Sequence, residues 1–164
     1  MANATPAMAA LTRAGITHRV HQIDHDPSVT AYGREAAEAL GADPGRVFKT
    51  LICSVAAQLV AAQLVVAIVP VSGELNLKAV ATALTAKSAE MADPAVAQRA
   101  TGYVVGGISP IGQKRRLPTL LDRRATAWET IYVSGGRRGL ELELAPADLL
   151  RVTRGTLADI ARPG

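Results

Sequence analysis

The stretch Val47-Phe48-Lys49-Thr50-Leu51-Ile52-Cys53-Ser54-Val55 and the later run Leu64-Val65-Val66-Ala67-Ile68-Val69-Pro70-Val71 decide the fold class of this chain. Both runs are apolar and rich in β-branched residues, which predicts two strands. Helix-start signals such as Thr5-Pro6 and Asp93-Pro94 occur among the strand patterns without a regular strand–helix–strand alternation. We therefore predict an α+β domain rather than a doubly wound sheet.

The remaining helix and strand signals in the sequence predict further short elements around these two strands. Capping residues, prolines and glycine stops predict helices over residues 5–15, 33–40, 75–84, 93–102 and 146–155. Apolar runs predict short strands over residues 16–23, 103–105, 117–121, 130–133 and 140–144. No stretch has the composition of a linker, so residues 1–164 are expected to form one domain.

A short tandem repeat lies between the two opening strands. Residues 56–60 and 61–65 both read Ala-Ala-Gln-Leu-Val. A five-residue period fits neither a strand nor a helix well, so we interpret the repeat as a lengthened hairpin or strand with no chemistry of its own.

Composition limits the class of protein. The chain has 164 residues, of which 49% are hydrophobic and 20% are charged, values typical of a globular domain. Aromatic residues make up only 3%, which argues against a stacking platform for single-stranded nucleic acid. Cys53 is the only cysteine, so an internal disulfide and a four-cysteine metal site are excluded. The sequence has neither a signal peptide nor a membrane span, and we expect a cytoplasmic protein without a membrane association.

Two glycine-rich loops flank a basic segment. The first reads Gly106-Gly107-Ile108-Ser109-Pro110-Ile111-Gly112 and continues into Gln113-Lys114-Arg115-Arg116, and the second reads Ser134-Gly135-Gly136-Arg137-Arg138-Gly139. Residues 114–138 carry seven Lys/Arg and two acids, a net charge of +5, whereas the whole chain carries +4. The positive charge is therefore local, which indicates a polyanionic partner at these loops.

The first loop has the glycine spacing of a P-loop but not its chemistry. Gln113 stands where the phosphate-binding lysine is needed, Lys114 stands where a hydroxyl is needed, and Pro110 removes an amide. We exclude nucleotide hydrolysis. A plain turn and an amide-lined pocket wall, with Ser109 as a polar contact, both stay open.

Several isolated residues are candidates for a catalytic, binding or metal-ligating role. Lys49 is a lone charge at the start of an apolar strand, and two interpretations are equally open: an edge lysine that discourages strand pairing, or an ammonium directed into a pocket. His18, His21 and His25 lie on a predicted strand and loop, where they do not form one face, so we expect neither a metal nor any other cofactor. Ser134 lacks a nucleophile elbow and fits a polar contact better. Cys53 is expected to be inert core.

Together, several of these segments resemble the YbaK family of Cys-tRNA(Pro)/Cys-tRNA(Cys) deacylases, relatives of the editing domain of prolyl-tRNA synthetase. The matching segments run in order over nearly the whole chain: His25-Asp26-Pro27, Phe48-Lys49-Thr50-Leu51, Glu90-Met91-Ala92-Asp93-Pro94, Thr101-Gly102-Tyr103, Gly106–Gly112 with Gln113-Lys114, Ile131-Tyr132-Val133-Ser134-Gly135-Gly136 and Ala158-Asp159-Ile160-Ala161. The resemblance implies one compact α+β domain with a mixed β-barrel or sheet and surrounding helices.

The resemblance also implies an activity and its residues. It implies hydrolysis of the ester that joins a mischarged amino acid, chiefly cysteine, to tRNA, without a cofactor and with the substrate's own thiol as the attacking group. Lys49, Gly106, Gly107 and Ser134 are the implied catalytic residues, and Tyr32, Thr50, Ile108, Ser109, Gly135 and Gly136 are the implied substrate contacts. Lys114, Arg115, Arg116, Arg137 and Arg138 are expected to steer the acceptor end of tRNA, with prolyl-tRNA synthetase as a transient partner.

Two departures and two alternatives accompany the resemblance. A tyrosine of the family falls on Ile23, which has no hydroxyl, and the repeated Ala-Ala-Gln-Leu-Val replaces a more polar hairpin. The sequence leaves open a preference for Ala-tRNA(Pro) and a non-catalytic module that binds tRNA or a synthetase. It does not determine the oligomeric state.

Overall fold

The computed structural model describes residues 4–24, 26, 28, 32–57 and 60–163, with backbone alone for residues 60 and 61. Helices and strands alternate irregularly along the chain, as the sequence predicts. Their bounds are α1 Pro6–Arg13, β1 Arg19–Gln22, α2 Tyr32–Leu40, β2 Phe48–Ala57, β3 Val60–Pro70, β4 Gly73–Leu75, α3 Leu77–Ala83, β5 Ser88–Met91, α4 Pro94–Thr101, β6 Thr119–Asp122, the 3-10 helix η1 Arg123–Ala127, β7 Ile131–Ser134, β8 Leu140–Leu144, α5 Pro146–Thr153, β9 Thr156–Ala158 and β10 Ala161–Pro163.

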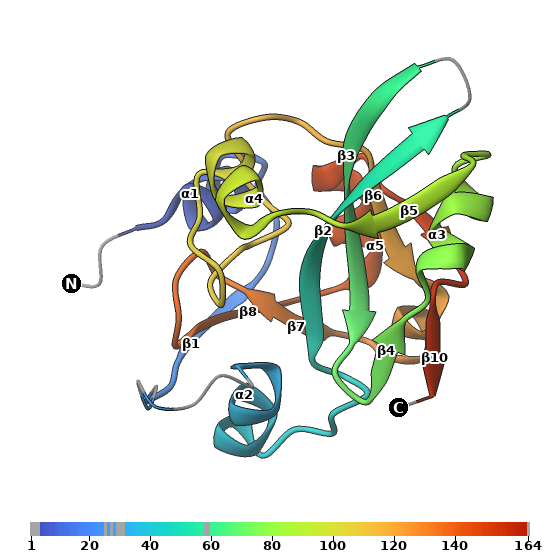
Figure 1. Ribbon diagram of the computed structural model, residues 1–164. Coiled ribbons are helices and arrows are strands. Elements are labelled where there is room, and N and C mark those ends of the chain that lie inside the picture. The colour runs from blue at the N-terminus through green and yellow to red at the C-terminus, as the bar shows by residue number, and fades with distance from the viewer. Residues whose placement is uncertain (1–3, 25, 27, 29–31, 58–59, 164) are drawn as a thin grey trace.

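The strands form three sheets (Figure 1). The largest has the order β5-β2-β3-β6-β9 and mixes antiparallel with parallel pairs, the second has the order β1-β8-β7, and the third pairs β10 with β4. A single parallel bridge between Val47 and Tyr132 connects the first two sheets. The predicted α+β class is confirmed. The strands described do not close into a barrel, so the barrel form of the expectation is wrong.

The helix ends follow the capping signals in the sequence. The Thr5 and Asp93 side chains accept hydrogen bonds from the backbone N–H groups of Met8 and Ala95, which fixes the starts of α1 and α4. Gly41, with φ +62°, follows the last residue of α2, and Gly102, with φ +81°, caps α4 in the left-handed conformation. The helices predicted over 33–40 and 93–102 are confirmed to within a residue.

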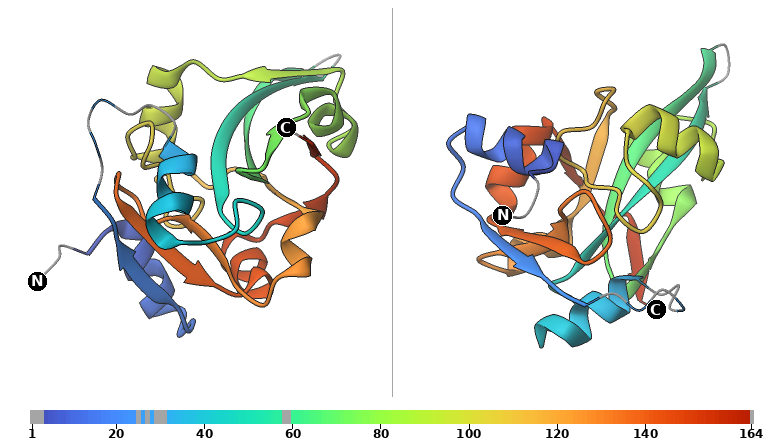
Figure 2. Two further views of the ribbon diagram at one scale, coloured as in Figure 1. Left: turned by 90° about the horizontal axis from the view of Figure 1, so that it is seen from below. Right: turned by 90° about the vertical axis from the view of Figure 1, so that its left-hand side faces the viewer.

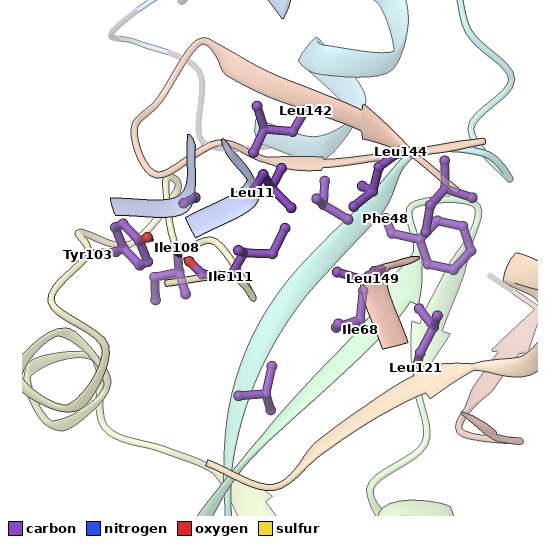
Figure 3. Packing of buried hydrophobic residues seen from close by; sticks show 14 of the residues in the cluster. Leu11, Phe48, Ile68, Tyr103, Ile108, Ile111, Leu121, Leu142, Leu144 and Leu149 are labelled. Carbon is purple, nitrogen blue, oxygen red and sulfur yellow. Dashed lines mark hydrogen bonds between the residues drawn. The ribbon is translucent and has the colours of Figure 1, made fainter. Parts of the chain in front are cut away.

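Alternation along β2 and β3 divides the hydrophobic core into two layers. Phe48, Ile52 and Ile68 face the main cluster beneath α1, α5 and the β7–β8 hairpin, which Figure 3 shows from close by. Cys53 and Val69 face a second cluster beneath α3. A third, smaller cluster lies where α2 crosses the three-stranded sheet (Figure 2) and contains Val47 and Tyr132. Cys53 is completely buried, so its assignment to the core is confirmed.

Several short elements depart from the sequence expectations. The strands β4, β5, β9 and β10 and the helix η1 were not predicted, because three or four residues carry too little periodicity. Residues 103–105 form no strand, since Tyr103 is a buried loop residue whose hydroxyl donates to the Ile111 carbonyl at 2.7 Å. The strand expected over 16–23 is shortened to β1.

The described residues of the Ala-Ala-Gln-Leu-Val repeat, 56, 57 and 60–65, belong to the paired strands β2 and β3, which project beyond the rest of the sheet in Figure 1. The pairing register shifts between Val55 and Ala57, just where the repeat begins. The expectation of a lengthened hairpin is confirmed. Among the helices of the described ranges, none is long and apolar enough to cross a membrane.

Candidate functional site

Lys49 is the second residue of β2 and is half-buried. It pairs across the sheet with Val69, which is completely buried, so its aliphatic stem lies on apolar surface. Burial lowers the pKa of the Lys49 ammonium, the carboxylate of Glu74 opposes that shift, and the guanidinium of Arg34 adds to it. The ammonium therefore lies within electrostatic range of β4 on one side and of the start of α2 on the other.

The first turn of α2 connects Lys49 to the glycine loops. Gly33 packs against Val71, where an added Cβ would lie 2.7 Å from a methyl carbon. The preceding residue, Tyr32, places its ring 5.0 Å from the guanidinium carbon of Arg138 in the second loop. The guanidinium of Arg138 also donates to the Val105 carbonyl in the first loop through its Nε and a terminal nitrogen, at 3.0 and 2.7 Å. Tyr32 and Arg138 thus fasten α2 and both loops together.

Glycine is required where the two loops meet. Gly106 has φ +90°, and a Cβ there would lie 2.8 Å from Arg138 Nε and 2.8 Å from the Tyr32 ring. At Gly107 a Cβ would lie 2.7 Å from the Cα of Arg137. These separations are shorter than van der Waals contact, so the Gly106-Gly107 backbone is pressed directly against Tyr32 and the 137–138 backbone.

The amides of the two glycine loops are only partly hydrogen-bonded within the chain. The Gly107 N–H donates to the Val104 carbonyl at 2.9 Å, the Gly135 N–H to the Leu140 carbonyl at 2.7 Å, and the Gly136 N–H to Ser134 Oγ at 3.3 Å. Within the described part of the chain, the N–H groups of Gly106, Ile108, Ser109 and Gly112 have no acceptor. These amides of the first loop are available to a ligand oxygen, whereas the Gly107 N–H is used within the loop.

Ser134 belongs to β7, which lies beside β2 and its Lys49 although the two strands belong to different sheets. The bridge between Val47 and Tyr132 sets β2 beside β7, and two residues further along each strand come Lys49 and Ser134. Ser134 in turn lies directly opposite Glu141 of β8. The adjacent Gly135–Leu140 pair is hydrogen-bonded, so Ser134 and Glu141 form a pair of the non-hydrogen-bonded kind, whose side chains approach closely.

Glu141 is the group that the sequence reasoning missed. It is only 8% exposed, and burial raises the pKa of its carboxyl from 4.5 to about 7. Burial is the one cause of this shift: in the ranges that the structure describes, no hydrogen bond or charge acts on the Glu141 carboxyl. The alternating run Leu140-Glu141-Leu142-Glu143-Leu144 was a sufficient signal, because it places both acids on the face opposite three core leucines.

Three predicted substrate contacts have side chains directed elsewhere. Thr50 alternates to the main-core face of β2, and its buried Oγ has no partner among the described residues. Ile108 packs into the main cluster near Tyr103 and Ile111 (Figure 3). Ser109 is completely buried, and its Oγ accepts the Ile111 N–H within the loop. Any contact that these residues make with a substrate would have to come from their backbone.

The five predicted tRNA-steering residues fall into two groups. Arg137 and Arg138 adjoin the Gly106-Gly107 backbone, as described above. Lys114, Arg115 and Arg116 lie beyond the first loop, and the backbone N–H groups of Lys114 and Arg115 donate to the last carbonyls of α4. The two groups therefore adjoin different parts of the fold, the glycine loops in one case and the end of α4 in the other.

The two histidines that the structure describes, His18 and His21, bond to groups of the protein itself. His21 Nε2 lies 2.9 Å from a carboxylate oxygen of Glu143, which also pairs with Arg46 at 3.0 Å and accepts from the Thr130 hydroxyl at 2.7 Å. Burial raises the pKa of Glu143, but the bonds from Thr130 and His21 and the charge of Arg46 outweigh it and lower the pKa overall. His25 lies outside the described residues. Within them, no cluster of metal-ligating side chains occurs.

A family model, a curated protein and a solved structure each match most of the chain, and all three concern aminoacyl-tRNA editing. The family model described as "Aminoacyl-tRNA editing domain" matches residues 25–152. A curated protein of Enterococcus faecalis, named "Putative Cys-tRNA(Pro)/Cys-tRNA(Cys) deacylase EbsC", is 43% identical over 124 residues, which span 76% of this chain and 73% of that protein. A solved structure described as a "putative trans-editing enzyme for prolyl tRNA synthetase" superposes with a TM-score of 0.79 at 25% identity, covering 96% of this chain and 95% of the other. A structure of a hypothetical protein superposes with a TM-score of 0.84 at 24% identity over 96% of this chain and all of the other, and supports the fold alone.

Proposed function

Because the chain belongs to the aminoacyl-tRNA editing-domain family, we propose that it removes cysteine from mischarged Cys-tRNA(Pro) in trans. The expectation of an aminoacyl-tRNA deacylase is thereby confirmed at the level of enzyme class. The preference for cysteine, the mechanism and the partner synthetase are the proposal. The name of the Enterococcus faecalis relative and the resemblance in the sequence both support the preference for cysteine.

One observation supports the proposal: the first turn of α2 is linked both to Lys49, through the charge of Arg34, and to Gly106, through the Tyr32 ring. Lys49 comes from one sheet, Ser134 from another and Gly106 from a loop, and Tyr32 and Arg34 of α2 reach the loop and the lysine respectively. An ammonium can hold the phosphate or ribose oxygens of the terminal adenosine. The Gly106 N–H, which has no acceptor among the described residues, can bind the oxyanion that develops on the ester carbonyl.

The ester of an aminoacyl-tRNA is already activated, so an enzymic nucleophile is not required. In the proposed step the substrate's sulfur attacks its own ester carbonyl carbon. A C–S bond forms, the ester C–O bond breaks, and the thiol proton ends on the released ribose oxygen. The amino acid leaves as a cyclic thioester, and water then breaks its C–S bond to give free cysteine, with one water proton returning to the sulfur. Glu141 has a pKa near neutrality and lies opposite Ser134, so its carboxyl can accept the thiol proton and return it to the leaving oxygen.

The proposed setting is the cytoplasm, with prolyl-tRNA synthetase and its tRNA as transient partners. Contacts from Arg137 and Arg138 to the acceptor end would go to phosphates and would not read sequence. Selection of the tRNA therefore falls to the synthetase, which has already bound it. A pull-down with labelled tRNA(Pro) in the presence and absence of the synthetase would test this division.

The decisive experiment is a panel of tRNA(Pro) charged with cysteine, alanine or serine. We expect the wild type to release cysteine fastest and Lys49→Ala to lose roughly a hundredfold or more of that rate, the range found when a charge-stabilising group is removed. Lys78→Ala, which removes an exposed lysine of α3, should match the wild type.

The panel also separates the alternatives. Faster release of alanine than of cysteine would establish an Ala-tRNA(Pro) preference and reject the cysteine proposal. Binding of tRNA without any release by the wild type would establish a non-catalytic module. Full activity in Lys49→Ala would remove the lysine from the mechanism.

A further inference from the structure

A cavity of about 430 Å³ lies between α1, α5 and the segment 110–119. Three arginines line it, Arg13 from the last turn of α1 and Arg115 and Arg116 from the basic segment. The other lining residues are small, apolar or neutral: Pro6, Ala9, Ala10, Pro110, Gly112, Gln113, Leu117, Thr119, Val152 and Thr153. No acidic side chain is among these described lining residues.

The backbone around the cavity is fixed even though the three arginine side chains are exposed. Gly112 lies so close to α1 that an added Cβ would be 2.6 Å from the Pro6 carbonyl oxygen. The Arg115 N–H donates to the Ala100 carbonyl at 3.0 Å, which ties the segment to α4 as well. The cations therefore project from a rigid rim that is formed before any ligand binds.

The neutral polar side chains of the cavity are hydrogen-bonded within the chain, whereas its cations have no carboxylate partner among the described residues. The Thr119 hydroxyl donates to the Leu117 carbonyl at 3.0 Å, and the Thr153 hydroxyl donates to the Leu149 carbonyl at 2.7 Å. Gln113 donates its amide to the Ser109 carbonyl at 2.9 Å. Within the described chain, none of the three guanidiniums has a carboxylate partner. Guanidinium groups without a carboxylate bind phosphate oxygens in a planar, bidentate manner.

We propose that Arg13, Arg115 and Arg116 form a second RNA contact, which binds backbone phosphates of a double-stranded RNA stem at a distance from the reacting ester. The cavity itself indicates phosphate binding, and only the choice of RNA as the source of the phosphates rests on the proposed function. It adds Arg13, which no sequence motif identified, and separates Arg115 and Arg116 from Arg137 and Arg138 at the glycine loops. A guanidinium rim without an aromatic side chain fits phosphates rather than stacked bases, so recognition there is independent of sequence.

The test compares Arg13→Ala/Arg115→Ala/Arg116→Ala with the wild type and with Lys78→Ala/Lys87→Ala/Arg19→Ala. The control removes three exposed cations from elsewhere on the surface and changes the net charge equally. Uncharged tRNA(Pro) is titrated against each protein at several salt concentrations. Each lost phosphate contact reduces the slope of log K against log [salt] by about one. We expect the cavity variant to lose roughly two to three from the slope and at least about tenfold in affinity at low salt, and the control to lose much less.

A second readout separates this proposal from the first. Release of cysteine from a short aminoacyl ester that contains only the terminal nucleotides should be equal in the wild type and the cavity variant, whereas KM for full-length Cys-tRNA(Pro) should rise. A wild type that binds tRNA with the expected slope but releases no amino acid would reject the deacylase proposal and leave the RNA contact standing.

Two outcomes would overturn the RNA contact. One is an unchanged affinity and salt slope in a cavity variant whose thermal unfolding matches the wild type. The other is loss of stabilisation by inorganic phosphate, in thermal unfolding, without any loss of tRNA binding, which would make the cavity a small-anion site.

Discussion

The guanidinium of Arg138 lies 5.0 Å from the ring centroid of Tyr32 and bonds the Val105 carbonyl at the same time. One side chain therefore fixes the start of α2 against both glycine loops. Arg138→Lys retains the charge but cannot form the planar, two-nitrogen contact. We expect it to lower the single-turnover rate for Cys-tRNA(Pro) by between tenfold and a hundredfold, roughly the effect of misplacing a catalytic group by 1 Å.

Affinity for uncharged tRNA is the control for Arg138→Lys. It should stay close to the wild type, since the charge is conserved. A variant whose rate and affinity both equal those of the wild type would show that the stacked geometry is dispensable.

Gly106→Ala should abolish deacylation and destabilise the fold. Its Cβ would meet the Tyr32 ring and Arg138 at 2.8 Å, and its φ of +90° is unfavourable for alanine. Gly41→Ala is the matched control, because Gly41 also has a positive φ, +62°, but an added Cβ there has nothing within 4 Å. The control should lose only about 1–2 kcal/mol, the cost of the left-handed conformation, and retain activity. Equal behaviour of the two variants in urea unfolding and turnover would refute the close packing at Gly106.

Glu141→Gln should stabilise the protein at alkaline pH. The pKa of the folded carboxyl, about 7, lies above the ordinary 4.5, so the folded state binds more protons than the unfolded state between these values. The free energy of unfolding therefore falls as the pH rises from 4.5 to 7. Removing the charge should add up to about 3 kcal/mol at pH 8 and little at pH 4, measured by urea unfolding.

Glu143→Gln provides a control of opposite sign on the same strand. The pKa of Glu143 is lowered through Thr130, His21 and Arg46, so its ionised form stabilises the fold and its removal should destabilise at pH 8. If Glu141→Gln also lost stability at pH 8, the carboxyl would not be buried without a partner. In turnover, loss of the Glu141 carboxyl should lower the rate by roughly a hundredfold, within the range of general acid–base catalysis.

Cys53→Ala should retain deacylation. Cys53 is completely buried, and burial raises the pKa of its thiol to about 11, so it is neither accessible nor ionised at neutral pH. Loss of the Sγ atom should destabilise the second core cluster by about 1 kcal/mol. A large fall in the turnover of a folded Cys53→Ala protein would implicate the enzyme's own thiol and weaken the substrate-thiol mechanism.

The sequence predicted those features that depend on local chemistry. Thr5, Asp93 and Gly102 are capping residues whose effect needs no distant partner, and the helices they bound were located to within one or two residues. The β2–β3 pair was equally visible, because β-branched residues fill both strands. The expectation that Lys49 and the glycine loops act together came from the resemblance, and the catalytic roles of these residues stay a prediction.

Long-range packing accounts for what the sequence did not reveal. Ser109 is polar and follows two glycines, yet its loop is pulled inward by Ile108 and Ile111, so the hydroxyl is buried. No sequence motif identifies Arg13, and only the position of α1 in the fold brings it to the cavity that Arg116 also lines. Both positions depend on contacts between segments that lie far apart in the chain.

The cap of α1 has a consequence for natural variation. Thr5 Oγ accepts the Met8 N–H and donates its own proton to the Gly135 carbonyl, so one hydroxyl begins the first helix and anchors the second glycine loop. Asp is as good a helix cap as Thr, but an ionised carboxylate has no proton to donate. Among relatives, Ser can therefore replace Thr5 with both bonds retained, whereas Asp would cap the helix but lose the bond to the Gly135 carbonyl. The residue at this helix cap is thus constrained by the loop that carries Ser134 as well as by the helix.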